Sequence, residues 1–502
     1  MPDVVTAVLR AGERWPAAPA LTGPGGRTLT YVELAARIHA VAGRLRAAGL
    51  RPGERMLFSV RPSPDAVVLA LGVVAAGGTV VFVDPGVGPE LFAARTELAV
   101  PGWAAAESVL YAAGRWPVRA LARRRGVLLP DYGALPVRHV RAGRWLPGVP
   151  RGALALAALQ RPGPSVEISD APEQDAVVVF TSGTTADPRA VVHTRGSLGA
   201  ALDVLATRCA LGPGTQVHTD QFLLGLPALV GGAHWSMPPY GFAPGASPDE
   251  LARGLAGATH TFLVPADLAA VLDAIEAGRV QLPPGLRQVL LGAAPVLPSL
   301  LVRATAALPD VEFLAVYGMT EILPVAIATA AEKIAHHGSG DLVGAPLPGV
   351  VARVGPDGEL LVSGPNLARG YLGAPPFTEH ATGDLARLDE GRIVLVGRAK
   401  DMIIRGHVNI YPGLYEPAIT RLPGVAEAVM VGLPDAVGDE RVVLAVVPEH
   451  RAVDVVARLW ARLPDMIDAS ALPDDIVLVE AIPVRGRTRK PDRAALRAEL
   501  AR

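Results

Sequence analysis

Hydrophobic positions follow helical and strand periods in turn along the first hundred residues. After Thr30, apolar residues return every three or four positions, and Glu33 completes the spacing of a capping box, which predicts a helix that begins after Thr30. The apolar residues of this pattern are Tyr31, Leu34, Ile38, Val41 and Leu45. Apolar runs at 55–60 and 79–83 predict short buried strands. Helices that alternate with apolar strands indicate an α/β fold with a parallel sheet covered on both faces.

An uncharged run of eighteen residues, 66–83, reaches the lower limit for a membrane span. Gly77 and Gly78 interrupt it, and Asp84 and Pro85 follow it directly. A buried helix, a Gly-Gly turn and a strand explain this pattern better than a membrane helix. We therefore expect no membrane span.

Length, charge and cysteine content narrow the class of protein. A chain of 502 residues is too long for one core, so we expect at least two domains. The net charge of −1 and the absence of a large charged block argue against nucleic acid as a partner. Cys209 is the only cysteine and the N-terminus has no signal-peptide pattern, so we expect a reducing, cytoplasmic location. The arginines of 115–125 favour an amphipathic surface helix; a basic dock for an acidic carrier or a membrane stays open.

The stretch 177–194 joins an apolar strand to a turn rich in hydroxyls and glycine. Residues 177–180 are apolar and β-branched or aromatic, which predicts a buried strand. A turn of Thr, Ser and Gly after such a strand presents backbone N–H groups and hydroxyls to an anion. The sequence therefore favours a phosphate-binding loop over an ordinary surface turn.

This loop resembles the phosphate loop of the adenylate-forming superfamily, T-S-G-T-T-G-x-P-K-G-V, which includes acyl-CoA synthetases, adenylation domains and luciferases. The matching residues are Thr181, Ser182, Gly183, Thr184, Thr185, Pro188 and Val191. Three residues depart: Ala186, Arg189 and Ala190 stand where the family has Gly, Lys and Gly. The resemblance implies that Thr181–Thr185, Ala186 and Arg189 face phosphates, with Thr184 taking part in catalysis.

Further motifs extend the resemblance from about residue 29 to the C-terminus, and they imply the nucleotide site. L-G-A-A-P at 291–295 resembles the adenine-binding turn. V-Y-G-M-T-E at 316–321 resembles the motif whose Tyr stacks on adenine and whose Glu helps to hold Mg²⁺ in the family. T-G-D at 382–384 implies a ribose contact, and Arg398 would also reach the ribose. The implied nucleotide-binding residues are Gly292, Ala293, Ala294, Pro295, Tyr317, Gly318, Met319, Thr320, Asp384 and Arg398, with Glu321 as catalytic metal ligand.

Two motifs near the C-terminus resemble the moving parts of the family. G-R-A-K-D-M-I-I-R-G-H at 397–407 matches the hinge motif, so Lys400 would be the pivot, and Gly406 and His407 would line the CoA tunnel. Lys490 falls where the family's catalytic lysine bridges carboxylate and phosphate, although Arg489 replaces the usual glycine before it.

An uncharged, glycine-rich stretch at 222–248 corresponds to the family's acyl pocket. Residues predicted to line it are Phe222, Leu223, Gly225, Gly231 and Gly232. Family members that adenylate amino acids have an Asp after an aromatic residue here, and that Asp holds the substrate ammonium. In this chain Leu223 follows Phe222 at that position, which argues against an amino acid substrate, although Asp220 lies near in the sequence. The stretch favours a bulky hydrophobic carboxylic acid.

The resemblance implies a large N-terminal domain, 1–398, of two α/β sheet subdomains and a small β-barrel at about 342–398, followed by a small mobile α+β lid domain, 399–502. The implied enzyme is an acyl-CoA ligase that uses ATP or acyl-AMP, CoA and, for adenylation, Mg²⁺. Because of Ala186, Arg189 and Ala190, we expect adenylation to be weak or lost, with acyl-AMP supplied by a partner ligase. A complete two-step synthetase, an enzyme that loads a carrier protein or closes a β-lactone, and a non-catalytic acyl-nucleotide binder stay open.

Overall fold

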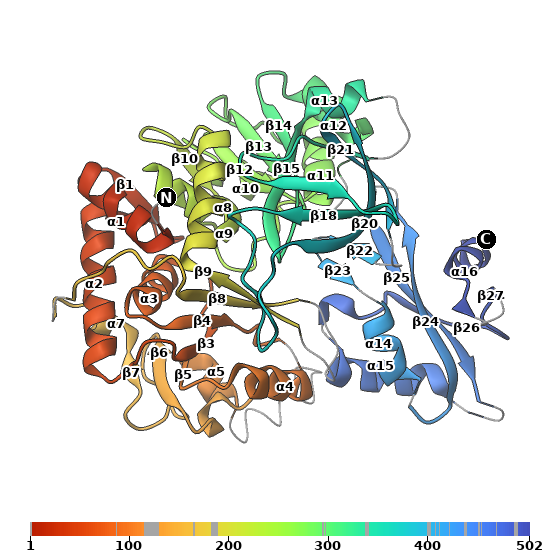
Figure 1. Ribbon diagram of the computed structural model, residues 1–502, viewed down its shortest axis with the longest axis horizontal. Coiled ribbons are helices and arrows are strands. Elements are labelled where there is room, and N and C mark those ends of the chain that lie inside the picture. The colour runs from red at the N-terminus through yellow and green to blue at the C-terminus, as the bar shows by residue number, and fades with distance from the viewer. Residues whose placement is uncertain are drawn as a thin grey trace.

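The computed structural model describes residues 3–501 except 87, 115–129, 164–165, 182–188, 294–295, 297, 337–340, 399–402, 407, 411, 421, 436–438, 450–451, 453, 468 and 486–489. Figure 1 shows a larger N-terminal part, coloured red to teal, and a smaller C-terminal unit, coloured blue, beside it. The α/β class with several sheets agrees with the sequence prediction.

One eight-stranded sheet has the order β19-β9-β8-β4-β3-β5-β6-β7, and its strands β8 and β9 flank the predicted phosphate loop. Its central strands are parallel, and β9 and β19 are antiparallel to their neighbours. The strands are β3 Arg55–Ser59, β4 Thr79–Phe82, β5 Trp103–Glu107, β6 Arg138–Ala142, β7 Leu154–Ala155, β8 Asp175–Phe180, β9 Ala190–Thr194 and β19 Gly370–Tyr371. Helices of this part are α2 Tyr31–Ala47, α3 Pro64–Ala75, α4 Pro89–Ala99, α5 Ser108–Ala113 and α7 Leu156–Leu159.

Two sequence predictions in this part are confirmed. The helix α2 begins after Thr30, whose side chain forms a capping box with Glu33. The uncharged run 66–83 divides into α3, a turn with Gly77 in a left-handed conformation, and the strand β4. In the described part of the chain, no helix combines the length and apolar character needed to cross a bilayer.

A second eight-stranded sheet, in the order β15-β14-β13-β12-β10-β11-β1-β2, lies beside the first. Its strands are β1 Pro19–Thr22, β2 Thr28–Thr30, β10 Gln216–His218, β11 His234–Ser236, β12 His260–Leu263, β13 Gln288–Leu291, β14 Glu312–Met319 and β15 Ile322–Thr329. The helices are α1 Val4–Arg14, α8 Arg195–Arg208, α9 Phe222–Gly231, α10 Pro248–Gly254, α11 Pro265–Glu276, α12 Pro298–Ala307 and α13 Ala330–Ala335. Apolar side chains between the two sheets form one continuous core.

The region predicted as a small barrel is a five-stranded antiparallel sheet in the order β16-β21-β20-β18-β17. Its strands are β16 Asp341–Gly344, β17 Val351–Val354, β18 Glu359–Ser363, β20 His380–Asp389 and β21 Arg392–Arg398. The T-G-D residues lie within β20 and not in a turn between strands, and Gly383 is in a left-handed conformation there, with φ of 77°.

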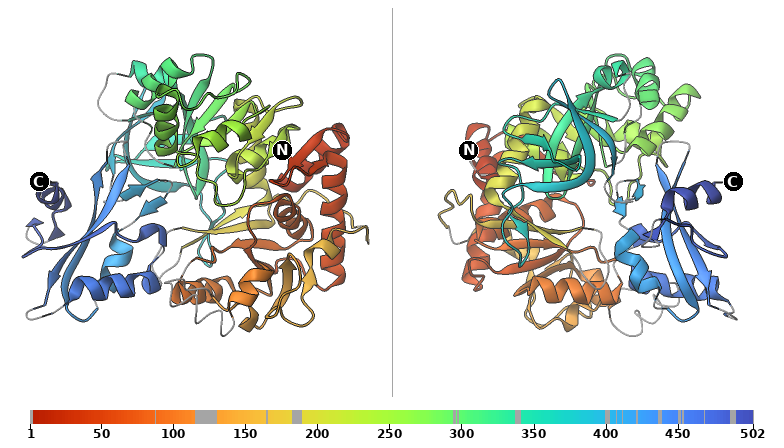
Figure 2. Two further views of the ribbon diagram at one scale, coloured as in Figure 1. Left: turned by 180° about the vertical axis from the view of Figure 1, so that it is seen from behind. Right: turned by 45° about the vertical axis from the view of Figure 1, so that its right-hand side comes forward.

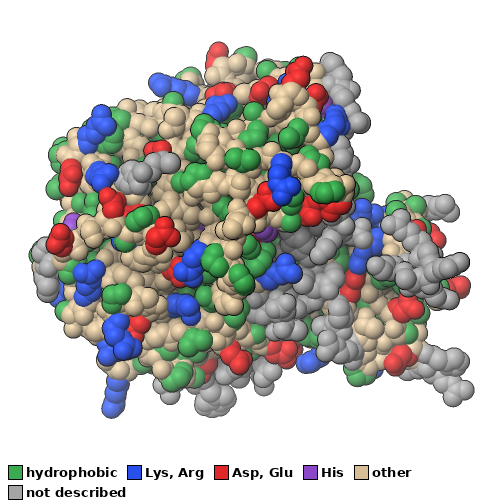
Figure 3. Space-filling model, in the orientation of Figure 1, with side chains coloured by type: hydrophobic (Ala, Val, Ile, Leu, Met, Phe, Trp, Pro, Cys, Tyr) green, Lys and Arg blue, Asp and Glu red, His purple; other side chains and the backbone are tan. Residues whose placement is uncertain are grey.

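The C-terminal unit has apolar cores of its own, and Figure 2 shows it at one side of the molecule. Its elements are β22 Ile403–Arg405, β23 Val408–Ile410, α14 Pro412–Ile419, β24 Val425–Pro434, β25 Glu440–Pro448, α15 Val455–Met466, β26 Asp475–Leu478, β27 Val484–Arg485, β28 Lys490–Pro491 and α16 Arg493–Leu500. The predicted boundary at 398 adjoins residues 399–402, outside the described residues, and stays a prediction. On the face shown in Figure 3, acidic and basic side chains are interspersed.

Candidate active site

The turn after β13 and the end of β14 lie at one edge of the second sheet, as expected for parallel neighbours, and both border a cavity that Val179 of β8 also lines. At the base of the phosphate loop, the Thr181 N–H donates to the Arg189 carbonyl oxygen at 3.0 Å. This bond continues the antiparallel pairing of β8 with β9. Residues 182–188, which include the predicted Ser182, Gly183, Thr184, Thr185 and Ala186, lie outside the described residues.

Ala190 lies in a strand and not in the loop that its motif position predicted. It is the first residue of β9, pairs with Phe180 and is buried in the core below the sheet. A residue paired in an antiparallel ladder needs no positive φ, so a Cβ is tolerated at this position. Ala190 therefore needs no glycine at its position, and the predicted effect of the departures on phosphate binding rests on Ala186 and Arg189.

Arg189, Tyr371 and Glu321 form a cluster beside the phosphate loop. The Arg189 guanidinium carbon lies 5.5 Å from the centre of the Tyr371 ring, and the Tyr371 hydroxyl donates to Glu321 Oε1 at 2.8 Å. β19 places Tyr371 there by pairing with Val191 of β9. Burial raises the pKa of the Tyr371 hydroxyl, the Glu321 carboxylate raises it further, and Arg189 opposes the shift. Tyr371 therefore contacts both Arg189, which stands in place of the family's lysine, and Glu321, the predicted metal ligand.

A single carboxylate such as Glu321 suits Mg²⁺, which is held in many sites by one or two carboxylates together with substrate phosphates. Across the residues that the structure describes, no cluster of three or more His, Cys, Asp or Glu side chains could hold a metal by itself. Glu321 is buried, with 9% of its surface exposed. Its chemistry therefore fits a metal shared with bound ATP, and this role stays a prediction.

Tyr317 and Asp384 meet at the predicted ribose position. The Tyr317 hydroxyl donates to Asp384 Oδ2 at 2.8 Å, and the Asp384 carboxylate is buried. The Asp384 N–H donates to Thr382 Oγ1 at 3.1 Å, and the Gly383 N–H donates to Glu359 Oε1 at 2.7 Å. These bonds hold the T-G-D segment so that Asp384 faces Tyr317. The buried acceptor is chemically suited to ribose hydroxyls.

The predicted adenine-binding turn follows β13. A Cβ on Gly292 would lie 3.3 Å from the Val316 carbonyl oxygen, and Ala293 takes a left-handed conformation with φ of 66°. Such a conformation in a non-glycine residue is uncommon and marks a tightly defined turn. Gly292, Ala293, Gly318, Met319 and Thr320 all border one cavity, described below. Ala294 and Pro295 lie outside the described residues.

Sequence reasoning missed His193, which is buried in β9. His193 Nε2 donates to the Thr320 carbonyl oxygen at 2.7 Å, so it holds the G-M-T-E turn against β9. Burial lowers the pKa of His193, and the bond to Thr320 opposes the shift. The imidazole is therefore favoured as a neutral donor to Thr320. No local pattern could have found it, because the bond joins β9 of the first sheet to the turn between β14 and β15 of the second sheet.

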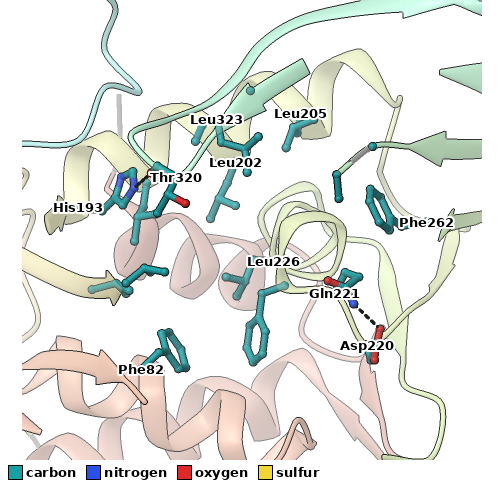
Figure 4. A pocket seen from close by; sticks show the side chains of 18 of the residues that line it. Phe82, His193, Leu202, Leu205, Asp220, Gln221, Leu226, Phe262, Thr320 and Leu323 are labelled. Carbon is teal, nitrogen blue, oxygen red and sulfur yellow. Dashed lines mark hydrogen bonds between the residues drawn. The ribbon is translucent and has the colours of Figure 1, made fainter. Parts of the chain in front are cut away.

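A cavity of about 800 Å³ extends from the nucleotide residues into the space between the two large sheets. Its walls are mostly apolar side chains from α3, α8, α9, β4 and β8, and Figure 4 shows Phe82, Leu202 and Leu226 among them. Polar lining residues include His193 and Thr320 on one side and Asp220, Gln221 and Asp267 on another. Gln221 Nε2 donates to Asp220 Oδ1 at 2.9 Å. Such a cavity is suited to an apolar ligand with few polar anchors.

Only part of the predicted acyl pocket faces this cavity. Phe222 lines it, and the side chain of Leu223 is outside the described part. A Cβ on Gly225 would lie 2.0 Å from the Trp235 indole, and one on Gly231 would lie 2.5 Å from the Leu211 carbonyl oxygen. Gly232 ends α9 in a left-handed conformation. The three glycines therefore let α9 pack closely, while β-sheet and helix side chains form the cavity wall.

We expect Gly225→Ala to lower stability by about 1–3 kcal/mol, the usual cost of overpacking a core, without changing which acid is preferred. Thermal unfolding would measure the first effect and a comparison of acyl substrates the second. Gly25→Ala is the control, because nothing lies within 4 Å of a Cβ at that position. A changed acid preference with unchanged stability would contradict this packing role.

The predicted CoA-tunnel residue Gly406 lies on the C-terminal unit in a left-handed conformation, with φ of 59°. Its N–H donates to Asp439 Oδ2, and the Ile404 N–H donates to Glu440 Oε2 at 2.7 Å. These bonds hold the 403–406 segment against β25. His407 and the predicted hinge Lys400 lie outside the described residues. Lys490 begins β28 and Arg398 pairs with Asp384 in the β20–β21 ladder; their catalytic and ribose-binding roles stay predictions.

Comparison with known proteins defines the class. The family model "AMP-binding enzyme" matches residues 8–372, and "AMP-binding enzyme C-terminal domain" matches residues 415–490. The chain therefore belongs to the AMP-binding, or adenylate-forming, enzyme family. It is an enzyme of the acid ligase group within that family, as its relatives indicate.

The names of the similar proteins refer to different acids and different acyl acceptors. The chain is 30% identical to a feruloyl-CoA synthase from an Amycolatopsis species, over 94% of this chain and 96% of that protein. It is 28% identical to the fatty acid–[acyl-carrier-protein] ligase ScoC of Streptomyces coeruleorubidus, over 95% and 91%. Its fold is similar to the solved structure of the amide bond synthetase McbA from Marinactinospora thermotolerans, with a TM-score of 0.81, 26% identity and 99% of both chains covered.

Proposed function

We propose that this protein transfers the acyl group of a bulky hydrophobic carboxylic acid from acyl-AMP to CoA. We also propose that its ATP-dependent adenylation step is weak or lost, with acyl-AMP coming from a partner ligase. The thiolate sulfur of CoA forms the new bond to the acyl carbon, the bond from that carbon to the phosphate oxygen breaks, and AMP leaves. Cofactors are then CoA and acyl-AMP, and Mg²⁺ is needed only where ATP is bound.

The observation that carries this proposal is the position of the apolar cavity. Gly292, Ala293 and Thr320, which are among the residues proposed to hold the adenylate, line this cavity together with its apolar walls. An acyl-AMP bound there would extend its acyl group away from the nucleotide, between β8 and α8. Because burial of each CH2 group in an apolar site is worth about 0.8 kcal/mol, a large hydrophobic acid gains most from this cavity.

Two features support a weak adenylation step. Ala186 replaces a glycine that would allow positive φ and close approach of backbone N–H groups to the outer phosphates of ATP. Arg189 replaces a compact ammonium, and its guanidinium lies over Tyr371. These positions serve the β- and γ-phosphates, which acyl-AMP lacks. Tyr317, Asp384 and Gly406, which we assign to acyl-AMP and CoA, are present. Lys490 argues the other way, because a purely thioesterifying enzyme has no need of it.

A comparison of synthetic acyl-AMPs tests the substrate class. We expect hexadecanoyl-AMP or a polycyclic acyl-AMP to give a kcat/KM for thioester formation at least about 100-fold above that of acetyl-AMP, because several methylene groups are buried. The acyl-CoA product is measured by liquid chromatography. If acetyl-AMP or an aminoacyl-AMP is preferred, the proposed acid class is wrong.

A different acceptor is the second candidate function. The likeness to an amide bond synthetase and to an acyl-carrier-protein ligase favours it, because both relatives pass an activated acid to something other than CoA. The same acyl-AMP assay, run with CoA, an amine or a pantetheinylated carrier protein as separate acceptors, distinguishes these outcomes. A product with amine or carrier and none with CoA would favour the second candidate.

A further inference from the structure

The first helix contributes to the wall of the apolar cavity. Val4, the first residue of α1, is 3% exposed and lines the cavity together with Val74 of α3 and Ala176 of β8. Val8, one turn further along α1, is equally buried but is not among the described lining residues. The start of α1 is therefore the part of this helix that meets the cavity.

The strand β8 shows how the cavity runs. Its six residues span roughly 17 Å at about 3.3 Å per residue, from Asp175 to Phe180, where the phosphate loop begins. Val177 and Val179 lie on one face of β8, two residues apart, and both border the cavity. Ala176, near the opposite end of the strand, and Val4 also line the cavity, and the start of α1 is bonded to the segment that leads into β8. The lining residues therefore extend along β8, from its nucleotide end to the start of α1.

A buried ion pair holds the start of α1 in place. Asp3 caps α1 by accepting from the Val5 and Thr6 N–H groups, and its carboxylate lies 2.7 Å from the Arg195 guanidinium. The side chains of Asp3 and Arg195 are 0% and 3% exposed. Arg195 begins α8, a wall of the cavity, so this pair joins the end wall to a side wall.

The segment that leads into β8 completes this anchor. The Ala171 N–H donates to Asp3 Oδ2 at 2.8 Å, and Arg195 donates to the Ser169 carbonyl oxygen at 2.9 Å. The Asp170 carboxylate accepts from the Thr6 hydroxyl and pairs with Arg10 at 2.9 Å. The bonds join α1, α8 and the segment 169–171. A wall held at several points is suited to stop a ligand rather than to yield to it.

We infer that α1 is the end wall of the acyl site and that Val4 sets the longest acyl tail the site accepts. The substrate class is then an acid with an extended apolar tail that runs along β8, rather than a short or wide acid. This inference rests on the proposed function, because it takes the cavity as the acyl site. It predicts a sharp upper limit of chain length that depends on the size of residue 4.

The test measures binding, so that it does not depend on turnover. Octanoyl, dodecanoyl and hexadecanoyl sulfamoyl adenosines, which imitate acyl-AMP, are titrated calorimetrically into the unmodified protein and into Val4→Leu, Val4→Trp and Val4→Ala. The larger residues should lower the affinity for the analogue with the longest tail that binds by about tenfold, which is equivalent to excluding roughly two methylene groups. The affinity for the octanoyl analogue should not change. Val4→Ala should shift the preference to longer tails. Val8→Ala is the matched control, with the same truncation on the same helix.

Each outcome bears on one statement. If none of the three analogues binds the unmodified protein, the proposed function fails. If they bind, and the Val4 variants keep the unmodified order of chain lengths or weaken all tails equally, the inference about α1 fails and the proposed function stands. If Val4→Trp does not fold, Val4→Leu and Val4→Ala still decide, because their opposite size changes should move the limit in opposite directions.

Discussion

Replacing Asp384 with alanine should lower kcat/KM for thioester formation from acyl-AMP by roughly 100-fold. The buried Asp384 carboxylate accepts from the Tyr317 hydroxyl, and we propose that it also accepts from both ribose hydroxyls. Hydrogen bonds to a charged group contribute about 1.5–3 kcal/mol each, so losing this acceptor costs about 3 kcal/mol or a factor of about 100. Steady-state assays with synthetic acyl-AMP and CoA measure the effect.

Two variants serve as controls for Asp384. Asp389→Ala removes the same kind of side chain from the end of the same strand and should leave kcat/KM unchanged. Tyr317→Phe keeps the ring, removes only the hydroxyl bonded to Asp384, and should have a smaller effect, up to about tenfold. Equal losses of kcat/KM in Asp384→Ala and Asp389→Ala, or no loss in Asp384→Ala, would show that Asp384 does not bind the nucleotide.

Restoring the family residues at two positions of the phosphate loop should raise adenylation. The double variant Ala186→Gly, Arg189→Lys returns a flexible backbone and a compact cation to the place of the outer phosphates. We expect acid-dependent ATP–pyrophosphate exchange to rise by roughly 100-fold, the usual worth of one well-placed group that stabilises developing charge. Thioester formation from acyl-AMP should change little, because acyl-AMP lacks those phosphates.

Ala190→Gly tests whether the strand residue next to the loop, rather than Ala186 or Arg189, limits adenylation. Ala190 is buried in β9, so its replacement should not raise exchange and should lower stability by about 1 kcal/mol through the lost methyl group and the freer backbone. Thermal unfolding and the exchange assay measure the two effects. A rise in exchange from Ala190→Gly alone would show that this position, and not Ala186 or Arg189, limits adenylation.

Local patterns predicted those elements whose causes are local. The capping box at Thr30 and Glu33, the helix and strand of 66–83 and the strand predicted at 177–180 all depend on neighbouring residues, and the structure has them. The resemblance also placed Tyr317 and Asp384 in one site, and they are in contact at 2.8 Å. Tyr317 lies in β14 and Asp384 in β20 of a different, antiparallel sheet, so it was the family resemblance and not strand geometry that predicted their proximity.

Features that depend on contacts between distant segments could not be predicted in this way. His193 bonds to Thr320 across two sheets, and Val4 meets a cavity whose other walls lie far along the chain. Gly225 was predicted to line the acyl pocket, yet it packs against the Trp235 indole. Ala190 looked like a loop residue because of its motif, yet β-pairing with Phe180 decides its conformation and its burial. In each case tertiary packing determines the role of a residue type that has several uses.

We propose that this ligase joins acyl groups to CoA but activates acids poorly. The unmodified protein can be tested in two assays on one preparation, a hydrophobic acid with Mg·ATP in the first and its synthetic acyl-AMP with CoA in the second. We expect ready formation of the acyl-CoA thioester and, in the same preparation, acid-dependent ATP–pyrophosphate exchange at least about 100-fold slower. Exchange as fast as thioester formation would contradict it, and would show a complete two-step synthetase.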